Sequence, residues 1–201
     1  QPTIDHRGPE FAGLGLKVLA DVRKIFQTQH PVVIYPGSGT GAWEAALVNL
    51  CSPGDTVVMY ETGHFAALWN KLALKLGLKT EVLGLPQGQN WRRGVQADLI
   101  EQRLSADTQH QIRAVCVVHN ETSTGVSTEV TRVAGADDGA LMVVDATSAA
   151  GGIDFDARNA DVYYFAPQKN FASDGGLWFA LMSPAAIARA AEVADTDRYI
   201  P

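Results

Sequence analysis

The stretch VVIYPGSGTGA, residues 32–42, joins a β-branched strand to a glycine-rich turn and the start of a helix. The same alternation continues along the chain. We expect further strands at 56–60, 80–85, 114–118, 141–144, 161–165 and 177–182, and helices at 9–28, 42–51, 65–76, 95–104 and 184–193. Several of these strands are apolar throughout, which is typical of a parallel sheet covered on both faces. The predicted fold is therefore α/β, with a mostly parallel sheet flanked by helices.

The composition indicates one compact domain. The chain has 201 residues, 46% of them hydrophobic and 19% charged, with a net charge of −6. Lysine and arginine form no run, so we expect no nucleic acid and no anionic membrane as a partner. No apolar stretch approaches the roughly 20 residues of a membrane-spanning helix. No signal peptide opens the sequence, and neither Gln1 nor Pro201 resembles a natural terminus, so we expect a fragment.

The two cysteines, Cys51 and Cys116, lack metal-ligand spacing and lie in apolar surroundings. We expect two buried free thiols, because disulfides are rare in reducing compartments. A cytoplasmic location and the absence of a metal site follow as expectations.

Five residues that carry chemistry each follow the end of a predicted strand: Gly37, Glu61, His119, Asp145 and Lys169. In a parallel sheet, ligands bind at the edge where the carboxyl ends of the strands meet. These side chains can therefore converge although they are far apart in the sequence.

Asp145 and Lys169 together match the needs of pyridoxal phosphate chemistry. A lysine amine forms a Schiff base with the cofactor aldehyde, and a carboxylate keeps the pyridine nitrogen protonated. Aromatic residues precede Lys169 and a glycine-rich turn follows it, so we expect a half-buried pocket that favours the neutral, nucleophilic amine. The alternatives are a capping role for Asp145 and an ordinary surface position for Lys169.

The glycine-rich turn at residues 37–42 offers a phosphate site, because glycines let an anion approach the free amides of a helix N-terminus. Ser38 and Thr40 add hydroxyl donors. Two alternatives stay open: a simple strand-to-helix turn, and a dinucleotide-binding G-x-G-x-x-A pattern with Glu61 as the ribose-binding acid. The second alternative predicts a nucleotide-dependent oxidoreductase.

Two further residues have ambiguous roles. Phe65 opens the helix that follows Glu61, where it either stacks on a planar ring or packs in the core. His119 has no serine or cysteine partner at a nucleophile's spacing, so we interpret it as a hydrogen-bonded turn residue and not as a catalyst.

Beyond these arguments, the motifs resemble the class V aminotransferases, a pyridoxal phosphate family of fold-type I. The segments 6–11 (HRGPEF), 38–45 (SGTGAWEA) and 61–65 (ETGHF) are similar to the alanine/serine–glyoxylate aminotransferase branch. The segments 120–125 (NETSTG), 145–148 (DATS) and 166–176 (APQKNFASDGG) are similar to phosphoserine aminotransferases of the actinobacterial type. The resemblance implies that the whole chain, 1–201, is the large cofactor-binding domain and lacks a small C-terminal domain.

The resemblance also implies roles within a cofactor site. Lys169 carries the Schiff base and moves the proton at the substrate α-carbon, while Asp145 pairs with the pyridine nitrogen. The phosphate contacts fall to Ser38, Gly39, Thr40 and Gln168. Phe65 stacks on the cofactor ring and Thr147 packs under it. Thr122 forms a hydrogen bond with the ring hydroxyl.

His6 and Arg7 match a pair that reaches the substrate across a homodimer. The function implied by the resemblance is transfer of an amino group from alanine or serine to glyoxylate. The alternatives are a phosphoserine aminotransferase acting between glutamate and 3-phosphohydroxypyruvate, a truncated non-catalytic domain, and the nucleotide-dependent oxidoreductase. A desulfurase is disfavoured, because neither Cys51 nor Cys116 sits where a reactive loop cysteine is needed.

Overall fold

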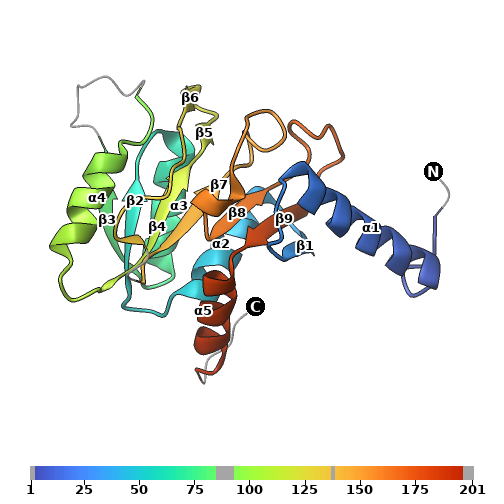
Figure 1. The fold of residues 1–201 in the computed structure, drawn as a ribbon, viewed down its shortest axis with the longest axis horizontal. Coiled ribbons are helices and arrows are strands. Elements are labelled where there is room, and N and C mark those ends of the chain that lie inside the picture. Colours follow the sequence, from blue (N-terminus) through green and yellow to red (C-terminus); the bar gives the residue numbers. More distant parts are fainter. Residues whose placement is uncertain (1–2, 85–92, 137–138, 197–201) are drawn as a thin grey trace.

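A seven-stranded sheet forms the middle layer of the computed structural model, which describes residues 3–84, 93–136 and 139–196 (Figure 1). In chain order the strands are β1 (Val32–Pro36), β2 (Thr56–Tyr60), β3 (Lys79–Leu83), β4 (Ile112–Val118), β7 (Leu141–Asp145), β8 (Val162–Phe165) and β9 (Leu177–Met182). Their order across the sheet is β1-β9-β8-β7-β4-β2-β3. A small hairpin of β5 (Asn120–Glu121) and β6 (Val126–Ser127) stands at one end.

Only β9 runs against the other strands of this sheet, since it pairs antiparallel with both β1 and β8. The remaining pairings, β8 with β7, β7 with β4, β4 with β2 and β2 with β3, are parallel. The carboxyl ends of β1, β2, β4, β7 and β8 therefore face the same edge. This confirms the predicted mostly parallel sheet.

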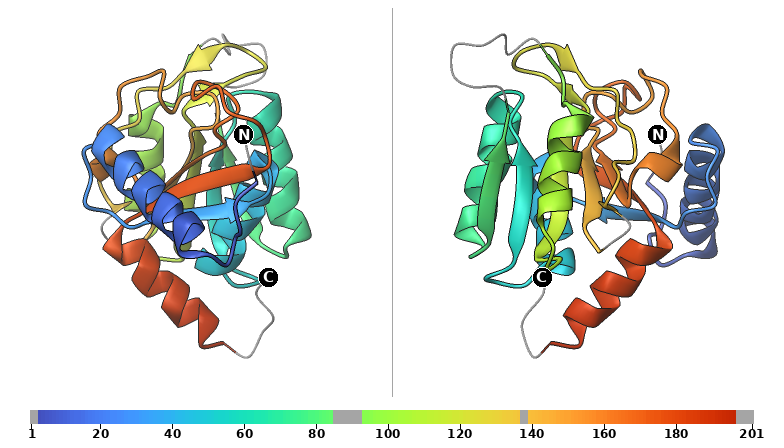
Figure 2. Two further views of the ribbon diagram at one scale, coloured as in Figure 1. Left: turned by 90° about the vertical axis from the view of Figure 1, so that its right-hand side faces the viewer. Right: turned by 60° about the vertical axis from the view of Figure 1, so that its left-hand side comes forward.

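Helices cover both faces of the sheet (Figure 2). Helices α2 (Gly39–Leu50), α3 (His64–Lys75) and α5 (Pro184–Ala194) pack on one face, and α1 (Pro9–Ile25) and α4 (Ala97–Ala106) on the other. A short 3-10 helix, η2 (Ala157–Asn159), precedes β8. In β2, Val57 and Met59 face the first group while Val58 and Tyr60 face the second. A strand buried on both sides is apolar at every position, which explains the unbroken apolar runs.

Most predicted boundaries lie within three residues of the observed ones, and the differences have local causes. Helix α2 begins at Gly39 and not at Ala42, because the Ser38 hydroxyl caps it by accepting a hydrogen bond from the Gly41 amide at 3.2 Å. Helix α1 ends at Ile25, and Gln27 then adopts a left-handed φ of 47° that stops it short of Thr28. Leu85, the predicted end of the third strand, lies outside the described residues.

Both cysteines are buried and neither forms a disulfide, as predicted. Burial raises the pKa of the Cys116 thiol well above its ordinary value, so the residue is an inert part of the core. No helix in the ranges that the structure describes has the length and apolar character needed to cross a membrane.

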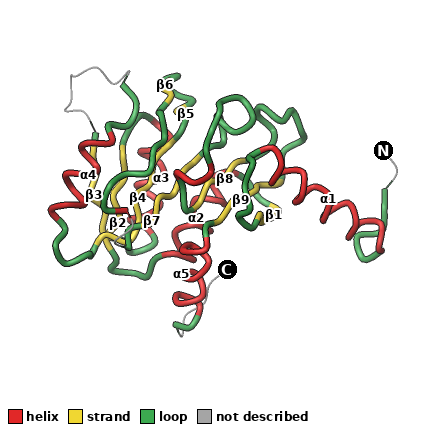
Figure 3. The backbone as a smooth tube through the Cα atoms, in the orientation of Figure 1, coloured by secondary structure: helices red, strands yellow, loops and turns green. Residues whose placement is uncertain are grey.

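Helix α1 extends beyond the rest of the molecule (Figures 1 and 3). Its C-terminal part packs against the sheet through Val22, which is 7% exposed. Its N-terminal part carries exposed apolar side chains, Phe11, Leu14 and Leu16. The apolar pattern predicted the helix correctly, but its first half is not covered by the described part of this chain.

A buried acid holds the opposite edge of the sheet together. Asp161, 2% exposed, lies just before β8. Its carboxylate accepts hydrogen bonds from the Met142 amide at 2.8 Å and the Ser183 hydroxyl at 2.7 Å, and Arg132 lies 3.4 Å away. These bonds satisfy a charge that would otherwise be costly to bury.

His119 follows β4 and is 2% exposed. Its amide donates to the Asp145 carbonyl at 2.9 Å, and its Nδ1 lies 3.2 Å from the Tyr163 hydroxyl. Burial lowers the pKa of its imidazole to about 4. The interpretation of His119 as a hydrogen-bonded structural residue is confirmed.

Acid should destabilise the fold through His119. Between its ordinary pKa of 6.5 and its lowered pKa of about 4, the unfolded chain binds a proton that the folded chain does not. Stability is therefore lost as the pH falls through this window, by at most about 3 kcal/mol. We expect His119→Phe to flatten the dependence between these limits, measured by urea unfolding. The exposed His110→Asn is the control, and an equal flattening in both variants would contradict the assignment.

Candidate functional site

A cavity of about 210 Å³ opens at the carboxyl edge of the sheet. Pockets that hold drug-sized ligands measure roughly 300–1,000 Å³, so this one suits a smaller, single-ring molecule. Its walls come from residues at or after the ends of five different strands, β1, β2, β4, β7 and β8. They are Ser38, Gly39, Thr40, Trp43, Phe65, Val118, Asn120, Thr122, Asp145, Thr147, Ser148, Gln168 and Lys169.

All nine residues expected at the cofactor line this one cavity. Glu61, His119, His6 and Arg7 do not line it. His6 and Arg7 are exposed and precede α1, at the end of that helix farthest from the body of the molecule (Figure 1). The structure thus brings the predicted cofactor residues together and leaves the predicted substrate pair apart from them.

Asp145 is the buried charge of the cavity, with 5% of its surface exposed. Its Oδ2 accepts a hydrogen bond from the Trp43 indole nitrogen at 2.7 Å, and its Oδ1 accepts one from the Thr147 amide at 2.9 Å. Burial raises the pKa of this carboxyl, and the two donors act against that rise. The carboxylate is therefore fixed in orientation before any ligand enters.

The turn that carries Lys169 is attached to the turn that follows Asp145. The Asn170 side chain donates to the Ala150 carbonyl at 3.3 Å. A Cβ at Gly152 would lie 2.5 Å from the Asn170 amide nitrogen, so any larger residue there would displace the Asn170 side chain. The amine and the carboxylate thus belong to two neighbouring turns at one rim.

The expected half-buried position of Lys169 is wrong for this chain. Gln168 and Lys169 are both exposed, although both line the cavity. The physical reason is the place of their turn, which stands at the open rim. The buried strand β8 ends before this turn, so burial of the strand does not extend to Gln168 and Lys169.

The start of α2 presents unpaired donors to the cavity. Within the described chain, the amides of Gly39 and Thr40 donate to no protein acceptor, whereas the next two amides bond to Ser38. Unpaired polar groups of this kind are rare unless a ligand completes them. An anion at the positive end of the helix would do so.

The structure does not place Glu61 where a dinucleotide-binding site would need an acid beside the glycine-rich turn. Four strands separate β1, which precedes the glycine-rich turn, from β2, which precedes Glu61. A ribose-binding acid must lie next to its glycine-rich turn. Glu61 is exposed and does not reach the cavity.

Sequence reasoning missed three polar contributors to the cavity: Trp43, Asn120 and Ser148. Trp43 follows Gly39 by four residues, so it lies on the same side of α2, and this spacing was a usable signal. The Ser148 hydroxyl lies 2.6 Å from that of Thr122, a pairing between distant segments that no local pattern predicts.

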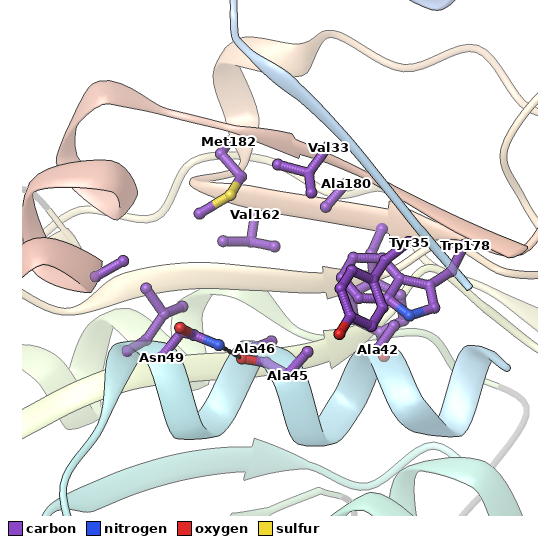
Figure 4. Close-up of a pocket in the computed structure, with 13 residues that line it drawn as sticks. Val33, Tyr35, Ala42, Ala45, Ala46, Asn49, Val162, Trp178, Ala180 and Met182 are labelled. Atoms are coloured by element: carbon purple, nitrogen blue, oxygen red, sulfur yellow. Dashed lines mark hydrogen bonds between the residues drawn. The ribbon is translucent and has the colours of Figure 1, made fainter. Parts of the chain in front are cut away.

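A second hollow, of about 370 Å³, lies between α2, α5 and the strands β1, β8 and β9 (Figure 4). Its walls are mostly apolar, including Val33, Val162 and Met182. Asn49 also lines this hollow, and its side-chain amide donates to the Ala45 carbonyl of the same helix at 2.8 Å. Without converging charged groups, this hollow is a poor candidate for chemistry.

Comparison with known proteins places this geometry in a family. The sequence profile described as "Aminotransferase class-V" matches residues 4–179. The chain belongs to the class-V aminotransferase family. Members of this family depend on pyridoxal phosphate, which is the cofactor that the unpaired donors, the buried acid and the lysine fit.

Three relatives illustrate the match to class-V aminotransferases. An L-aspartate–glyoxylate aminotransferase of Paracoccus denitrificans is 38% identical over 98% of this chain and 50% of its own length. A putative phosphoserine aminotransferase of Mycolicibacterium vanbaalenii is 36% identical over the same shares. The crystal structure of an alanine–glyoxylate aminotransferase from Nostoc sp. superposes with a TM-score of 0.84 at 25% identity, covering 100% of this chain and 52% of that one. The chain spans about half the length of these relatives.

The Trp43 indole should control the protonation of Asp145. Trp43→Phe removes a donor to the charged form, so we expect the pKa of Asp145 to rise further and stability at pH 7 to fall by about 1.5–3 kcal/mol beyond the effect of the smaller ring. A ¹³C NMR titration of the carboxyl group and urea unfolding measure the two effects.

Trp69→Phe is the matched control. Trp69 stacks on Trp43 with ring centroids 6.0 Å apart, and its indole nitrogen has no acceptor among the described residues. The same change there removes equal volume without removing a hydrogen bond. Equal shifts of the Asp145 titration in both variants would show that packing, and not the indole donor, sets it.

Proposed function

We propose that this chain is the cofactor-binding part of a pyridoxal phosphate-dependent aminotransferase that uses glyoxylate as amino acceptor. One observation carries the proposal: Asp145 and Lys169 line a single cavity whose third wall is the open N-terminus of α2. A buried acid, an amine and an anion site are the three contacts that the cofactor requires.

The start of α2 supplies the phosphate contacts in this proposal. The amides of Gly39 and Thr40 and the hydroxyls of Ser38 and Thr40 donate to the phosphate, and the helix dipole adds a favourable field. Gln168, which also lines the cavity, provides a further amide donor. The charge of the phosphate thereby meets donors that lack another partner.

Asp145 keeps a proton on the pyridine nitrogen. Its carboxylate is already held by hydrogen bonds from Trp43 and Thr147 and lines the cavity, so it would meet the cofactor at little further conformational cost. A cationic nitrogen is the partner that a buried carboxylate needs, because an unpaired charge there is unfavourable. When bound, the cofactor acts as an electron sink for the substrate α-carbon.

Lys169 holds the cofactor through its Nζ and then moves the α-proton of the substrate. Its exposure at the rim leaves the amine free to swing between these two tasks. Phe65 covers one face of the ring and excludes water, and Thr147 supports the ring near Asp145. Thr122, paired with Ser148, meets the ring hydroxyl. The reaction alternates between an amino acid donor and a 2-oxo acid acceptor.

The names of the relatives support glyoxylate as acceptor, since two of the three name it. Alanine and serine are the donors that the sequence motifs predict. A second candidate, transfer to 3-phosphohydroxypyruvate, is favoured by the name of the Mycolicibacterium relative. His6 and Arg7 suit either acceptor, because both acceptors are anions.

Borohydride trapping tests the proposed chemistry. With added pyridoxal phosphate we expect the chain to absorb visible light and, after reduction, to carry one stable adduct at Lys169 by peptide mapping. Lys169→Ala should lose the adduct. Lys75→Ala, an exposed lysine in the last turn of α3, should keep it. A colourless chain without an adduct contradicts the proposal.

The amino acid that the chain produces identifies the 2-oxo acid that it accepts. The chain mixed with pyridoxamine phosphate should convert glyoxylate to glycine at least about tenfold faster than it converts 3-phosphohydroxypyruvate to phosphoserine, a preference of about 1.4 kcal/mol. The opposite ratio would select the phosphoserine candidate. Mass spectrometry of the two amino acids distinguishes them.

We also propose that two copies of the chain assemble through α1, and that the protein is cytoplasmic, as two buried cysteines outside any disulfide favour. Phe11, Leu14 and Leu16 are 45%, 49% and 70% exposed on a helix that extends from the molecule. Several exposed apolar side chains gathered on one element are typical of an interface. In such a homodimer His6 and Arg7 would lie beside the partner's cavity.

Charges on α1 should separate the copies. Leu14→Glu with Leu16→Glu is expected to convert a dimer into a species of the chain's own 21.5 kDa in sedimentation velocity, because carboxylates resist burial in an apolar interface. Leu74→Glu, at a 53% exposed leucine on α3, is the control and should leave the dimer intact. A monomeric unmodified chain would refute the role of α1.

A further inference from the structure

Glu121 is completely buried, at 0% exposure, yet it does not line the cavity. It lies in β5, directly before Thr122. Its carboxylate accepts four hydrogen bonds: from the Ser123 amide at 3.0 Å, the Ser123 hydroxyl at 2.6 Å, the Phe65 amide at 3.4 Å and the Ala66 amide at 3.1 Å. Four donors on one buried carboxylate indicate a defined task.

These bonds cap α3 from a distant part of the chain. The residue before the helix is Gly63, which has no side chain to act as a cap. The Phe65 and Ala66 amides donate to Glu121, and the His64 amide donates to the Ser123 hydroxyl at 2.9 Å. The first three free amides of the helix are therefore satisfied by a segment 55 or more residues away. The negative charge of a carboxylate also suits this end of a helix.

The approach of the two segments is close enough to require glycine. A Cβ at Gly63 would lie 2.6 Å from Cγ and 2.8 Å from Cδ of Glu121. Glu121 has no room to yield, because both carboxylate oxygens are held. A further bond, from the Thr124 hydroxyl to the Thr62 carbonyl at 3.2 Å, joins the same two segments.

We propose that Glu121 is a positioning residue for the cofactor site. It joins the first turn of α3, which carries Phe65, to the turn that carries Thr122, and so sets the separation of two walls of the cavity. It also occupies the positive end of α3, which leaves the start of α2 as the open anion site. The role in cofactor capture rests on the function proposed above, whereas the placement of Phe65 does not.

The test compares Glu121→Gln with Asp161→Asn, since both replace a fully hydrogen-bonded buried acid by its amide. Three quantities are measured: hydrogen exchange of the Phe65 and Ala66 amides, nuclear Overhauser contacts between the Phe65 and Trp43 rings, and the pyridoxal phosphate concentration that gives half-maximal borohydride trapping at Lys169. The ring centroids of Phe65 and Trp43 lie 6.4 Å apart in the folded chain.

Glu121→Gln replaces one of two accepting oxygens by an NH2 group, although three backbone N–H groups, those of Phe65, Ala66 and Ser123, need acceptors there. We expect about tenfold faster exchange at the Phe65 and Ala66 amides, weaker ring contacts, and about a tenfold higher concentration for half-maximal trapping. Asp161→Asn should lower the melting temperature and leave all three quantities unchanged. Gly63→Ala, which displaces the carboxylate from the other side, should reproduce the effects of Glu121→Gln.

Two results would overturn the inference. The first is that the nuclear Overhauser contacts between the Phe65 and Trp43 rings are the same in Glu121→Gln as in the unmodified chain. The other is faster exchange with unchanged trapping, which would make Glu121 a cap and nothing more. If the unmodified chain traps no cofactor, the proposed function fails, and the ring contacts still decide the placement of Phe65. If Glu121→Gln does not fold, the milder Ser123→Ala should shift the same quantities in the same direction.

Discussion

The arrangement of the site depends on one buried carboxylate, that of Asp145. A charge in this position must be satisfied, and the chain satisfies it with the Trp43 indole and the Thr147 amide. Trp43 belongs to α2 and Thr147 to the turn after β7, so a single acid joins the helix with the open amides to the turn next to Lys169. The acid also lines the cavity. The cofactor contacts in our proposal are thus consequences of how this chain satisfies one charge.

Two helices begin at the same edge of the sheet, and the fold treats them differently. At the start of α2 the amides of Gly39 and Thr40 are open to the cavity. At the start of α3 the equivalent amides are occupied by Glu121 and Ser123. Since each helix N-terminus attracts anions, the internal carboxylate removes one of two competing sites. The start of α2, the helix that also carries Trp43, is the one of these two N-termini that stays open to the cavity.

Much of the fold and the cofactor cluster could be predicted from the chain. The apolar strands indicated a covered parallel sheet, and the rule that strand ends converge placed Asp145, Lys169 and the glycine-rich turn together. The same rule, applied without strand order, also allowed a partnership between that turn and Glu61. Only the order across the sheet, which puts four strands between β1 and β2, removed it. The sequence also did not predict that Lys169 is exposed. Its exposure depends on how far its turn extends beyond the end of the buried strand, which only the tertiary structure shows.

The sequence by itself determined which elements form, since periodicity and turn residues act over a few neighbouring positions. It also determined which residue types were available to hold an anion, a pyridine nitrogen and an aldehyde. The tertiary structure decided which of these residues meet. The bonds from Trp43 to Asp145, from Glu121 to the start of α3 and between Thr122 and Ser148 join segments 26 to 102 residues apart. No local pattern encodes such pairs, because their partners are chosen by strand order and by the need to satisfy every buried charge.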